Sequence, residues 1–174
     1  MPLQDVDFEK IHWLVLDVDG VLTNGTVMLH PDGSESKQFN LQDGHGIKMF
    51  KRAGLEVALL SGRESAATQR RADQLQIEHV FEGCTAKLPV LEEFMHSQGI
   101  TFEQVAYMGD DVLDLPVVKR VGLGVAVANA VNELKRYADY VTDKAGGEGA
   151  VREVIELILK RSGRWQALME RYFV

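Results

Sequence analysis

Short apolar runs alternate with amphipathic stretches along most of this chain. The apolar runs are typical of buried strands and predict strands at His12–Asp17, Glu56–Ser61, Glu78–Phe81, Val105–Gly109, Leu123–Val127 and Tyr140–Thr142. The stretches between them predict helices at 44–53, 65–75, 86–97, 112–121, 131–137 and 149–160. Strands that alternate with helices need crossover connections, which produce a parallel sheet with helices on both faces. The chain therefore predicts an α/β fold, a doubly wound parallel sheet of the Rossmann-like kind.

Two segments do not follow this alternation. Thr26–His30 and Glu35–Asn40 flank the turn signal Pro31-Asp32-Gly33, which predicts a projecting β-hairpin over about residues 24–41. The last residues, about 162–174, are rich in large apolar side chains and have no place in the predicted sheet. Nothing resembles a repeat or a linker, so we expect residues 1–174 to form a single domain.

The composition narrows the class of protein. The chain has 174 residues, of which 45% are hydrophobic, and a formal net charge of −7, which argues against a nucleic acid or an anionic membrane as the main partner. Its one cysteine cannot form an internal disulfide, as suits a reducing compartment. The first residues do not resemble a signal peptide, and the longest uncharged stretch, 121–132, is shorter than the ~20 residues that span a bilayer. We expect a soluble, cytoplasmic protein.

Two aspartates stand where the first predicted strand ends, in Leu14-Val15-Leu16-Asp17-Val18-Asp19-Gly20. Residues i and i+2 of a strand face the same way, so Asp17 and Asp19 are expected to leave the sheet side by side. Their carboxylates would repel each other by roughly 4 kcal/mol at an effective dielectric near 20. We therefore expect them to share a cation, share a proton or divide roles. The alternative is a strand that ends in a solvated acidic turn.

Three more polar groups are predicted at the same edge of the sheet. They are Ser61-Gly62-Arg63 after the second strand, Lys87 at the start of a helix, and Asp110-Asp111 with Asp114 after the fourth strand. Carboxylates bind a hard divalent cation, for which Mg²⁺ is the natural choice, and Asp17, Asp19 and Asp110 are the predicted ligands. The Ser61 hydroxyl, the Gly62 amide and Lys87 offer donors to phosphoryl oxygens.

This combination predicts phosphoryl transfer. Asp17 is expected to attack phosphorus in line and form an aspartyl-phosphate. Asp19 is expected to protonate the leaving alcohol and then to take a proton from the hydrolytic water. Mg²⁺ and Lys87 would offset charge on the transferred group. The predicted catalytic residues are therefore Asp17, Asp19, Ser61 and Lys87.

The ordered motifs Asp17-x-Asp19-Gly-x-Leu-Thr, Ser61, Lys87 and Gly109-Asp110-Asp111-x-x-Asp114 resemble the haloacid dehalogenase superfamily. Within it, an aspartate at position 19 resembles the phosphatases and mutases. The gaps between the motifs hold no room for a cap domain, so the site is expected to be open unless a neighbouring subunit covers it. Asp111 and Asp114 have two interpretations: acids favoured by a helix dipole, or groups that orient the metal ligands.

A finer resemblance is to the phosphatases of 3-deoxy-D-manno-octulosonate 8-phosphate, which serve lipopolysaccharide sugar synthesis. It rests on Thr23-Asn24-Gly25, Phe39-Asn40-x-x-Asp43-Gly44-x-Gly46-Ile47-Lys48, Ser61-Gly62-Arg63, Gly109-Asp110-Asp111-Val112-x-Asp114, Val125-Ala126-Val127-x-Asn129-Ala130 and Gly146-Gly147-x-Gly149-Ala150-Val151-Arg152-Glu153. This resemblance implies a homotetramer whose sites neighbouring subunits complete. It implies a substrate site for a phosphorylated sugar acid, formed by Asp19, Asn40, Asp43, Gly44, Lys48, Gly62, Arg63, Arg71 and Lys87.

Some assignments stay open. Arg63 is expected to pair with a carboxylate or phosphate, whereas Lys48 and Arg71 have the alternative of solvated helix positions. His45 is a candidate for substrate contact, and Arg152 is another unless it has a structural role at a helix start. Asp43 is a predicted N-cap of helix 44–53. The competing functions are a phosphatase of a nine-carbon sialic-acid-type 9-phosphate, a phosphatase of relaxed specificity, and a catalytically silent assembly module.

Overall fold

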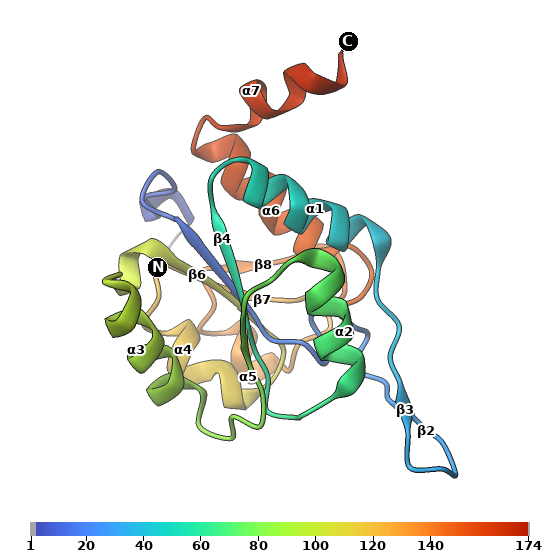
Figure 1. Cartoon of the computed structure of the whole chain (residues 1–174). Helices are drawn as coiled ribbons and strands as arrows, with labels where there is room; N and C mark the ends of the chain where they lie inside the picture. Colours follow the sequence, from blue (N-terminus) through green and yellow to red (C-terminus); the bar gives the residue numbers. More distant parts are fainter. Residues whose placement is uncertain (1–2, 174) are drawn as a thin grey trace.

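A parallel sheet forms the centre of the computed structural model, which describes residues 3–173 (Figure 1). Its strand order is β5-β4-β1-β6-β7-β8, and each neighbouring pair is parallel. The strands are β1 Trp13–Leu16, β4 Glu56–Leu60, β5 His79–Phe81, β6 Val105–Gly109, β7 Leu123–Ala126 and β8 Tyr140–Val141. The predicted fold and strands are confirmed. Met1, Pro2 and Val174, which belong to the predicted domain and tail, lie outside the described residues.

Helices cover both faces of this sheet (Figure 1). One face carries α1 Leu41–Arg52, α2 Ala66–Leu75 and α6 Ala150–Arg161, and the other carries α3 Lys87–Gln98, α4 Leu115–Val118 and α5 Asn132–Lys135. Short 3₁₀ turns lie at η1 Leu3–Asp5, η2 Phe102–Gln104 and η3 Val112–Asp114. None of the helices within residues 3–173 is long and apolar enough to cross a membrane.

Two helix predictions are wrong at their boundaries. Helix α1 begins at Leu41 because Asn40, not Asp43, is its N-cap: the Asn40 side chain accepts hydrogen bonds from the amides of Gln42 and Asp43. The predicted helix 112–121 is replaced by η3 followed by the short α4. Pro116 has no N–H to donate to the Val112 carbonyl, so regular α-helical bonding cannot run through this segment.

The buried apolar side chains form one core on both sides of the sheet. Helix α6 shows why its sequence forms an amphipathic helix: Val151, Val154, Ile155, Ile158 and Leu159 recur at helical spacing and are fully buried. On the sheet, Leu16 of β1 is paired with Leu59 of β4 and with Met108 of β6. The carboxyl ends of these three strands therefore lie side by side.

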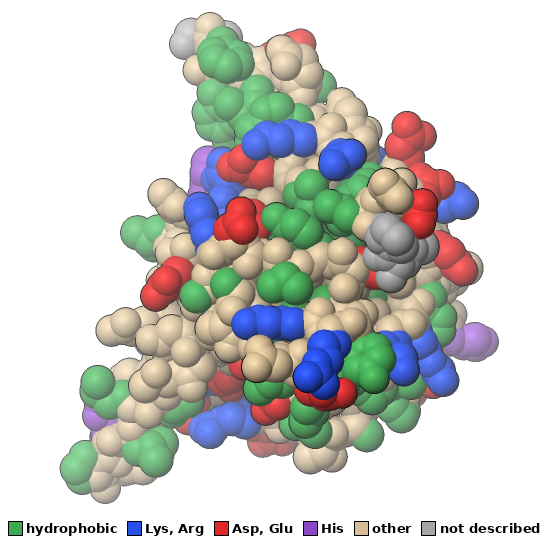
Figure 2. Space-filling view, turned by 180° about the vertical axis from the view of Figure 1, so that it is seen from behind, with side chains coloured by type: hydrophobic (Ala, Val, Ile, Leu, Met, Phe, Trp, Pro, Cys, Tyr) green, Lys and Arg blue, Asp and Glu red, His purple; other side chains and the backbone are tan. Residues whose placement is uncertain are grey.

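Two segments project from this core (Figure 1). The predicted hairpin is confirmed: β2 Met28–Leu29 pairs antiparallel with β3 Glu35–Ser36, and Gly33 takes the left-handed conformation at the turn. The predicted tail is helical, with α7 Trp165–Met169 followed by η4 Glu170–Tyr172. Seen from behind, both projections carry hydrophobic side chains at the surface (Figure 2). These include Met28 and Leu29 on the hairpin and Phe173 at the end of the tail.

Candidate active site

The predicted catalytic residues meet at the carboxyl edge of the sheet. Asp17 follows β1, Ser61 follows β4 and Asp110 follows β6. Together they line a cavity of about 270 Å³. The residues around this cavity are Asp17, Asp19, Gly25, Ser61, Gly62, Arg63, Lys87, Asp110, Asp111, Leu113 and Asp114. Residues from four separate segments of the chain thus surround one volume, as parallel strands ending at one edge require.

The loop after β1 is a tight turn built on backbone hydrogen bonds. The Asp17 amide still donates to Met108 O at 3.0 Å, while the amides of Val21, Leu22 and Thr23 all converge on Val18 O. The Thr23 hydroxyl accepts hydrogen bonds from the amides of Gly20 and Gly25, each at 3.2 Å. This turn keeps the backbone of Asp17 and Asp19 in one conformation, which favours a fixed placement of their side chains.

Glycine is required where this loop comes close to the Asp110 side chain. Gly20 has a φ of +90°, and a Cβ there would overlap the Asp110 carboxylate. The loop before α6 packs against the same turn: a Cβ at Gly146 would overlap Gly20 O, and the Gly147 amide donates to Val21 O at 2.9 Å. The glycine-rich segment 146–149 therefore supports the turn through close backbone packing.

Lys87 is the buried cation of the site. Its ammonium lies 2.9 Å from Asp17 Oδ1 and 2.6 Å from Asp114 Oδ1, and the side chain is 3% exposed. Asp114 uses both oxygens: Oδ1 also accepts from the Tyr107 hydroxyl at 2.6 Å, and Oδ2 accepts from the amides of Asp110 and Asp111. Asp114 thus anchors Lys87 and holds the start of the loop that carries Asp110.

The site holds more negative than positive charge, and the pKa values of its carboxyls reflect this. Burial, opposed by Lys87 and reinforced by Asp114, raises the pKa of Asp17 to about 6. Burial and then the charges of Asp17 and Asp114 raise the pKa of Asp110 to about 7. Burial alone would lower the pKa of Lys87, but Asp17 and Asp114 raise it above its ordinary value. One further cation would balance the cluster.

The oxygen donors suit a divalent ion. One carboxylate oxygen each from Asp17, Asp110 and Asp114 lie within 4.8 Å of one another. The oxygens of Asp114 are already occupied by Lys87, Tyr107 and two amides, which leaves Asp17 and Asp110 as the available ligands of this group. A hard ion with oxygen ligands such as Mg²⁺ fits this donor set. The Asp19 carboxylate lies outside the group.

Asp19 is instead held by a residue that the sequence patterns did not single out. Lys37 Nζ lies 2.8 Å from Asp19 Oδ1 and donates to Oδ2 at 3.0 Å. Lys37 follows β3 and points the same way as Glu35, two residues before it. The two-residue spacing of Glu35 and Lys37 was the only sequence signal we identify for this contact. It is a weak one, because an isolated lysine after a hairpin normally faces solvent.

Arg63 lies at the rim of the cavity and faces the hairpin. Its Nη2 donates to Glu35 Oε2 at 2.8 Å, and its Nε lies 3.8 Å from Asp19 Oδ2. The Arg63 side chain keeps 52% of its exposure, so it remains accessible to a ligand. Ser61 accepts a hydrogen bond from the Arg63 amide at 3.2 Å, which leaves its own O–H free to donate into the cavity.

The remaining predicted substrate residues do not line this cavity. Asn40, Asp43, Gly44, Lys48 and Arg71 gather around α1 instead. Arg71 Nη2 donates to Asn40 O at 3.1 Å, its guanidinium lies 5.5 Å from the centre of the Phe39 ring, and a Cβ at Gly44 would overlap it. Lys48 is exposed on the same helix.

Asp43 caps a different helix from the one predicted. Its carboxylate accepts from the amides of Arg152 at 2.8 Å and Gly149 at 3.3 Å, which are the free donors at the start of α6. Burial raises the pKa of Asp43, and these two hydrogen bonds oppose the rise. The Arg152 side chain pairs with Glu156 at 2.7 Å. The hydrogen bond from the Arg152 amide to the Asp43 carboxylate thus connects α6 to α1.

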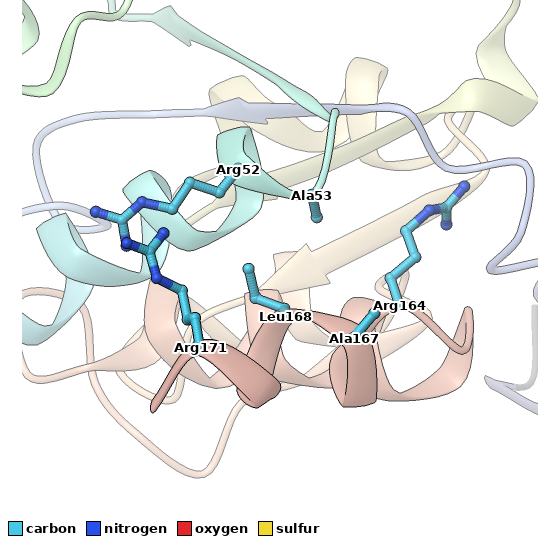
Figure 3. A pocket seen from close by; sticks show the side chains of 6 residues that line it. All are labelled: Arg52, Ala53, Arg164, Ala167, Leu168 and Arg171. Carbon is cyan, nitrogen blue, oxygen red and sulfur yellow. The ribbon is translucent and has the colours of Figure 1, made fainter. Parts of the chain in front are cut away.

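A larger hollow, of about 390 Å³, lies between the end of α1 and the C-terminal segment (Figure 3). Arg52, Arg164 and Arg171 line it with Ala53, Ala167 and Leu168. His45 lines a separate hollow beside Arg152, and its ring nitrogens contact the Tyr172 hydroxyl and Arg152 Nη1. Among residues 3–173, no carboxylate lines the larger hollow, so the smaller cavity at the sheet edge is the candidate active site.

Comparison with known proteins gives consistent relatives. A family model described as haloacid dehalogenase-like hydrolase matches residues 81–155. The 3-deoxy-D-manno-octulosonate 8-phosphate phosphatases KdsC of Salmonella typhi and Escherichia coli K12 are each 44% identical to this chain over 156 residues, covering 90% of this chain and 83% of theirs.

Solved structures agree with the fold. A probable YrbI family phosphatase from Pseudomonas syringae is 48% identical, with a TM-score of 0.94 over 96% of this chain and 95% of that one. The 3-deoxy-D-manno-octulosonate 8-phosphate phosphatase of Moraxella catarrhalis, in complex with magnesium, phosphate and KDO, is 39% identical, with a TM-score of 0.92 over 95% of each chain.

The charge surplus generates a stability prediction for Asp110→Asn in metal-free protein. The pKa of Asp110 is higher in the folded than in the unfolded protein, so ionisation of Asp110 destabilises the fold. This destabilisation is absent below about pH 4 and complete above about pH 7. At pH 8 in EDTA we expect the free energy of unfolding of the variant to exceed that of the wild type by about 1 kcal/mol, and its Tm to be higher by about 2–4 °C. At pH 4 the two proteins should unfold alike.

Asp73→Asn is the matched control, because it also removes one carboxylate charge and Asp73 is exposed on α2, away from the cavity. Thermal unfolding at both pH values, with and without Mg²⁺, makes the measurement. Mg²⁺ should raise the Tm of the wild type and of the control but not that of Asp110→Asn. An Asp110→Asn Tm below that of the wild type at pH 8 in EDTA would contradict the charge surplus.

Proposed function

We propose that this chain, which belongs to the haloacid dehalogenase-like hydrolase family, removes the phosphate of 3-deoxy-D-manno-octulosonate 8-phosphate. The observation that carries the proposal is the Asp17 carboxylate, paired with buried Lys87 at the floor of a cavity lined by Ser61 and Asp110. The similarity to the KdsC phosphatases supports the choice of substrate. The products would be the free sugar acid and inorganic phosphate, as a step of lipopolysaccharide sugar synthesis in the cytoplasm.

In the first step, an Asp17 oxygen attacks phosphorus opposite the leaving oxygen. The new Asp17 O–P bond forms as the P–O bond to the sugar carbinol oxygen breaks. The electron pair of the broken bond stays on the sugar oxygen, which takes a proton from the Asp19 carboxyl. The result is an aspartyl-phosphate on Asp17 and a free sugar alcohol.

In the second step, water replaces Asp17 on phosphorus. Asp19, now a carboxylate, takes one proton from the attacking water as its oxygen bonds to phosphorus. The Asp17–phosphorus bond breaks, and its electron pair returns to the Asp17 carboxylate. Inorganic phosphate leaves, Asp19 is protonated again, and the enzyme is ready for another turnover.

The other residues hold the phosphoryl group during both steps. Ser61 and Gly62 line the cavity, where the Ser61 O–H and the Gly62 amide would act as donors. The Lys87 ammonium uses two of its three hydrogens on Asp17 and Asp114, which leaves one for a phosphoryl oxygen. Mg²⁺ would be bound by the carboxylates of Asp17 and Asp110, close to the loop that carries Asp19. It would add electrostatic stabilisation of the transferred group. Asp111 and Asp114 would orient these ligands.

We also propose that the chain is a single domain that assembles as a homotetramer in which neighbouring subunits complete each site. The cavity has no cap over it, and Arg71, Asn40 and Lys48 lie away from the cavity of their own chain. The hairpin exposes Met28 at 61% and Leu29 at 75%, an apolar surface that a second subunit would cover. In such an assembly Arg63 and Arg71 would bind the sugar carboxylate.

Phosphate release from three substrates tests the function. We expect a kcat/KM for 3-deoxy-D-manno-octulosonate 8-phosphate at least 10²-fold above that for N-acetylneuraminate 9-phosphate or an aryl phosphate, because a site with hydrogen-bonding groups matched to one sugar rejects others. Turnover should vanish in EDTA. Asp17→Asn should lose activity by 10⁴-fold or more while its Tm stays near that of the wild type.

Asp73→Asn again serves as the control, with activity within a few-fold of the wild type. Equal turnover of the three substrates would overturn the substrate assignment and leave a phosphatase of relaxed specificity. A preference for the nine-carbon substrate would favour a sialic-acid-type phosphatase. A wild type without turnover, or an active Asp17→Asn variant, would contradict the proposed chemistry.

Subunit complementation tests the shared site. If Arg71 serves a neighbour, then mixed tetramers of Asp17→Asn and Arg71→Ala chains will contain sites with both residues intact. We expect such mixtures, dissociated and reassembled together, to regain activity that neither variant has alone. Asp17→Asn mixed with Lys87→Met should stay inactive, because both residues line one cavity. A mixture no more active than its components would contradict the shared site. Arg70→Ala is the control for loss of a neighbouring positive charge.

A further inference from the structure

Lys37 is a buried lysine that the chemical steps above leave without a role. Its side chain has no exposed surface, although it belongs to a hairpin that projects into solvent (Figure 1). The ammonium lies 2.8 and 3.0 Å from the two Asp19 oxygens. It also donates to the Thr68 hydroxyl at 3.2 Å and lies 3.9 Å from Glu35 Oε1. A lysine is almost never fully buried unless it is paired, so this pairing sets its position.

The contacts of Asp19 are few. Its carboxylate has Lys37 as its close partner, and Arg63 Nε approaches Oδ2 only to 3.8 Å. The Asp17 carboxylate, by contrast, pairs with Lys87. Each of the two aspartates thus has its own buried lysine. Without Lys37, rotation about the Asp19 side-chain bonds would be restrained by Arg63 alone.

We propose that Lys37 is the positioning residue for Asp19 and fixes its carboxyl group where the leaving oxygen of the substrate will lie. This inference rests on the proposed function, in which Asp19 transfers the proton. A proton donor must lie within about 3 Å of the atom that it protonates, and a displacement of about 1 Å can cost 10²-fold in rate. The hairpin thereby contributes to the chemical step as well as to assembly.

The base of the hairpin is tied to the site at a second point. Glu35 lies beside Lys37 and accepts from Arg63 Nη2 at 2.8 Å. The order Asp19–Lys37–Glu35–Arg63 runs as a chain of alternating charge along the rim of the cavity. Movement of the hairpin at β3 would therefore shift Lys37 and Asp19 together, whereas Asp17 after β1 and Lys87 at the start of α3 would stay in place.

Leaving-group dependence tests this role. An alkyl leaving oxygen needs a proton as the P–O bond breaks, whereas 4-nitrophenolate leaves without one. For Lys37→Met we expect the first-turnover rate of leaving-group release to fall by about 10²-fold with 3-deoxy-D-manno-octulosonate 8-phosphate and by only a few-fold with 4-nitrophenyl phosphate. Asp19→Asn should show the same selective pattern with a larger loss. Lys37→Arg, which keeps the charge, should recover part of the rate with the sugar phosphate.

Lys10→Met, which removes an exposed lysine that is paired only with Asp7, is the matched control and should match the wild type on both substrates. Circular dichroism and the Tm establish that each variant is folded. Should Lys37→Met fail to fold, Thr68→Val replaces it: this variant removes one acceptor at 3.2 Å from the ammonium and should give a smaller loss of the same selective kind.

The contradicting results are distinct. Equal losses of the first-turnover rate on both substrates would overturn the positioning role and make Lys37 a structural residue. A higher KM with unchanged kcat would overturn it in favour of direct contact with the substrate. Both results require an active wild type. A wild type with no Mg²⁺-dependent turnover of either substrate would overturn the proposed function itself, and the role of Lys37 with it.

Discussion

The ion cluster of Lys87 with Asp17 and Asp114 is the interaction on which the site depends. One buried ammonium lies within 2.9 Å of both carboxylates, and removal of such a partner from buried charges typically costs 3–5 kcal/mol. The cluster joins three parts of the chain: the end of β1, the start of α3 and the turn after β6. It also orients the proposed nucleophile. Packing and catalysis therefore share one set of contacts, and the excess negative charge that remains gives a cation its place.

Much of this arrangement follows from local sequence pattern. Runs such as Val105–Gly109 predict their strands because the period and the bounding residues are local, and the observed β6 has the same limits. Asp17, Ser61, Lys87 and Asp110 could be placed together because parallel strands bring their carboxyl ends to one edge. Helix boundaries were less certain, since Asn40 and Asp43 are both good capping residues and only tertiary packing on α6 decides between them.

The role of Lys37 could not be predicted in this way. Its burial depends on how a short hairpin folds back over the loop after β1, and the two-residue spacing of Glu35 and Lys37 does not by itself predict that contact. The same limit applies to Arg71 and Lys48, which do not line the cavity of their own chain and whose expected place in the substrate site depends on the proposed assembly. The C-terminal segment is a further case: its large apolar side chains gave it no place in the predicted sheet and did not predict the helix at Trp165–Met169.

In the proposed mechanism, Asp17 carries the phosphoryl group between two steps in which Asp19 transfers the proton. An Asp19→Asn variant with 4-nitrophenyl phosphate should isolate the first step, because that leaving group needs no proton whereas hydrolysis of the intermediate needs a base. Rapid acid quench and peptide mass spectrometry then locate the phosphoryl group. We expect a burst of 4-nitrophenolate equal to the number of sites, with the phosphoryl group on the peptide that contains Asp17. A burst with the group on another residue, or turnover with no phosphorylated peptide and no burst, would contradict it.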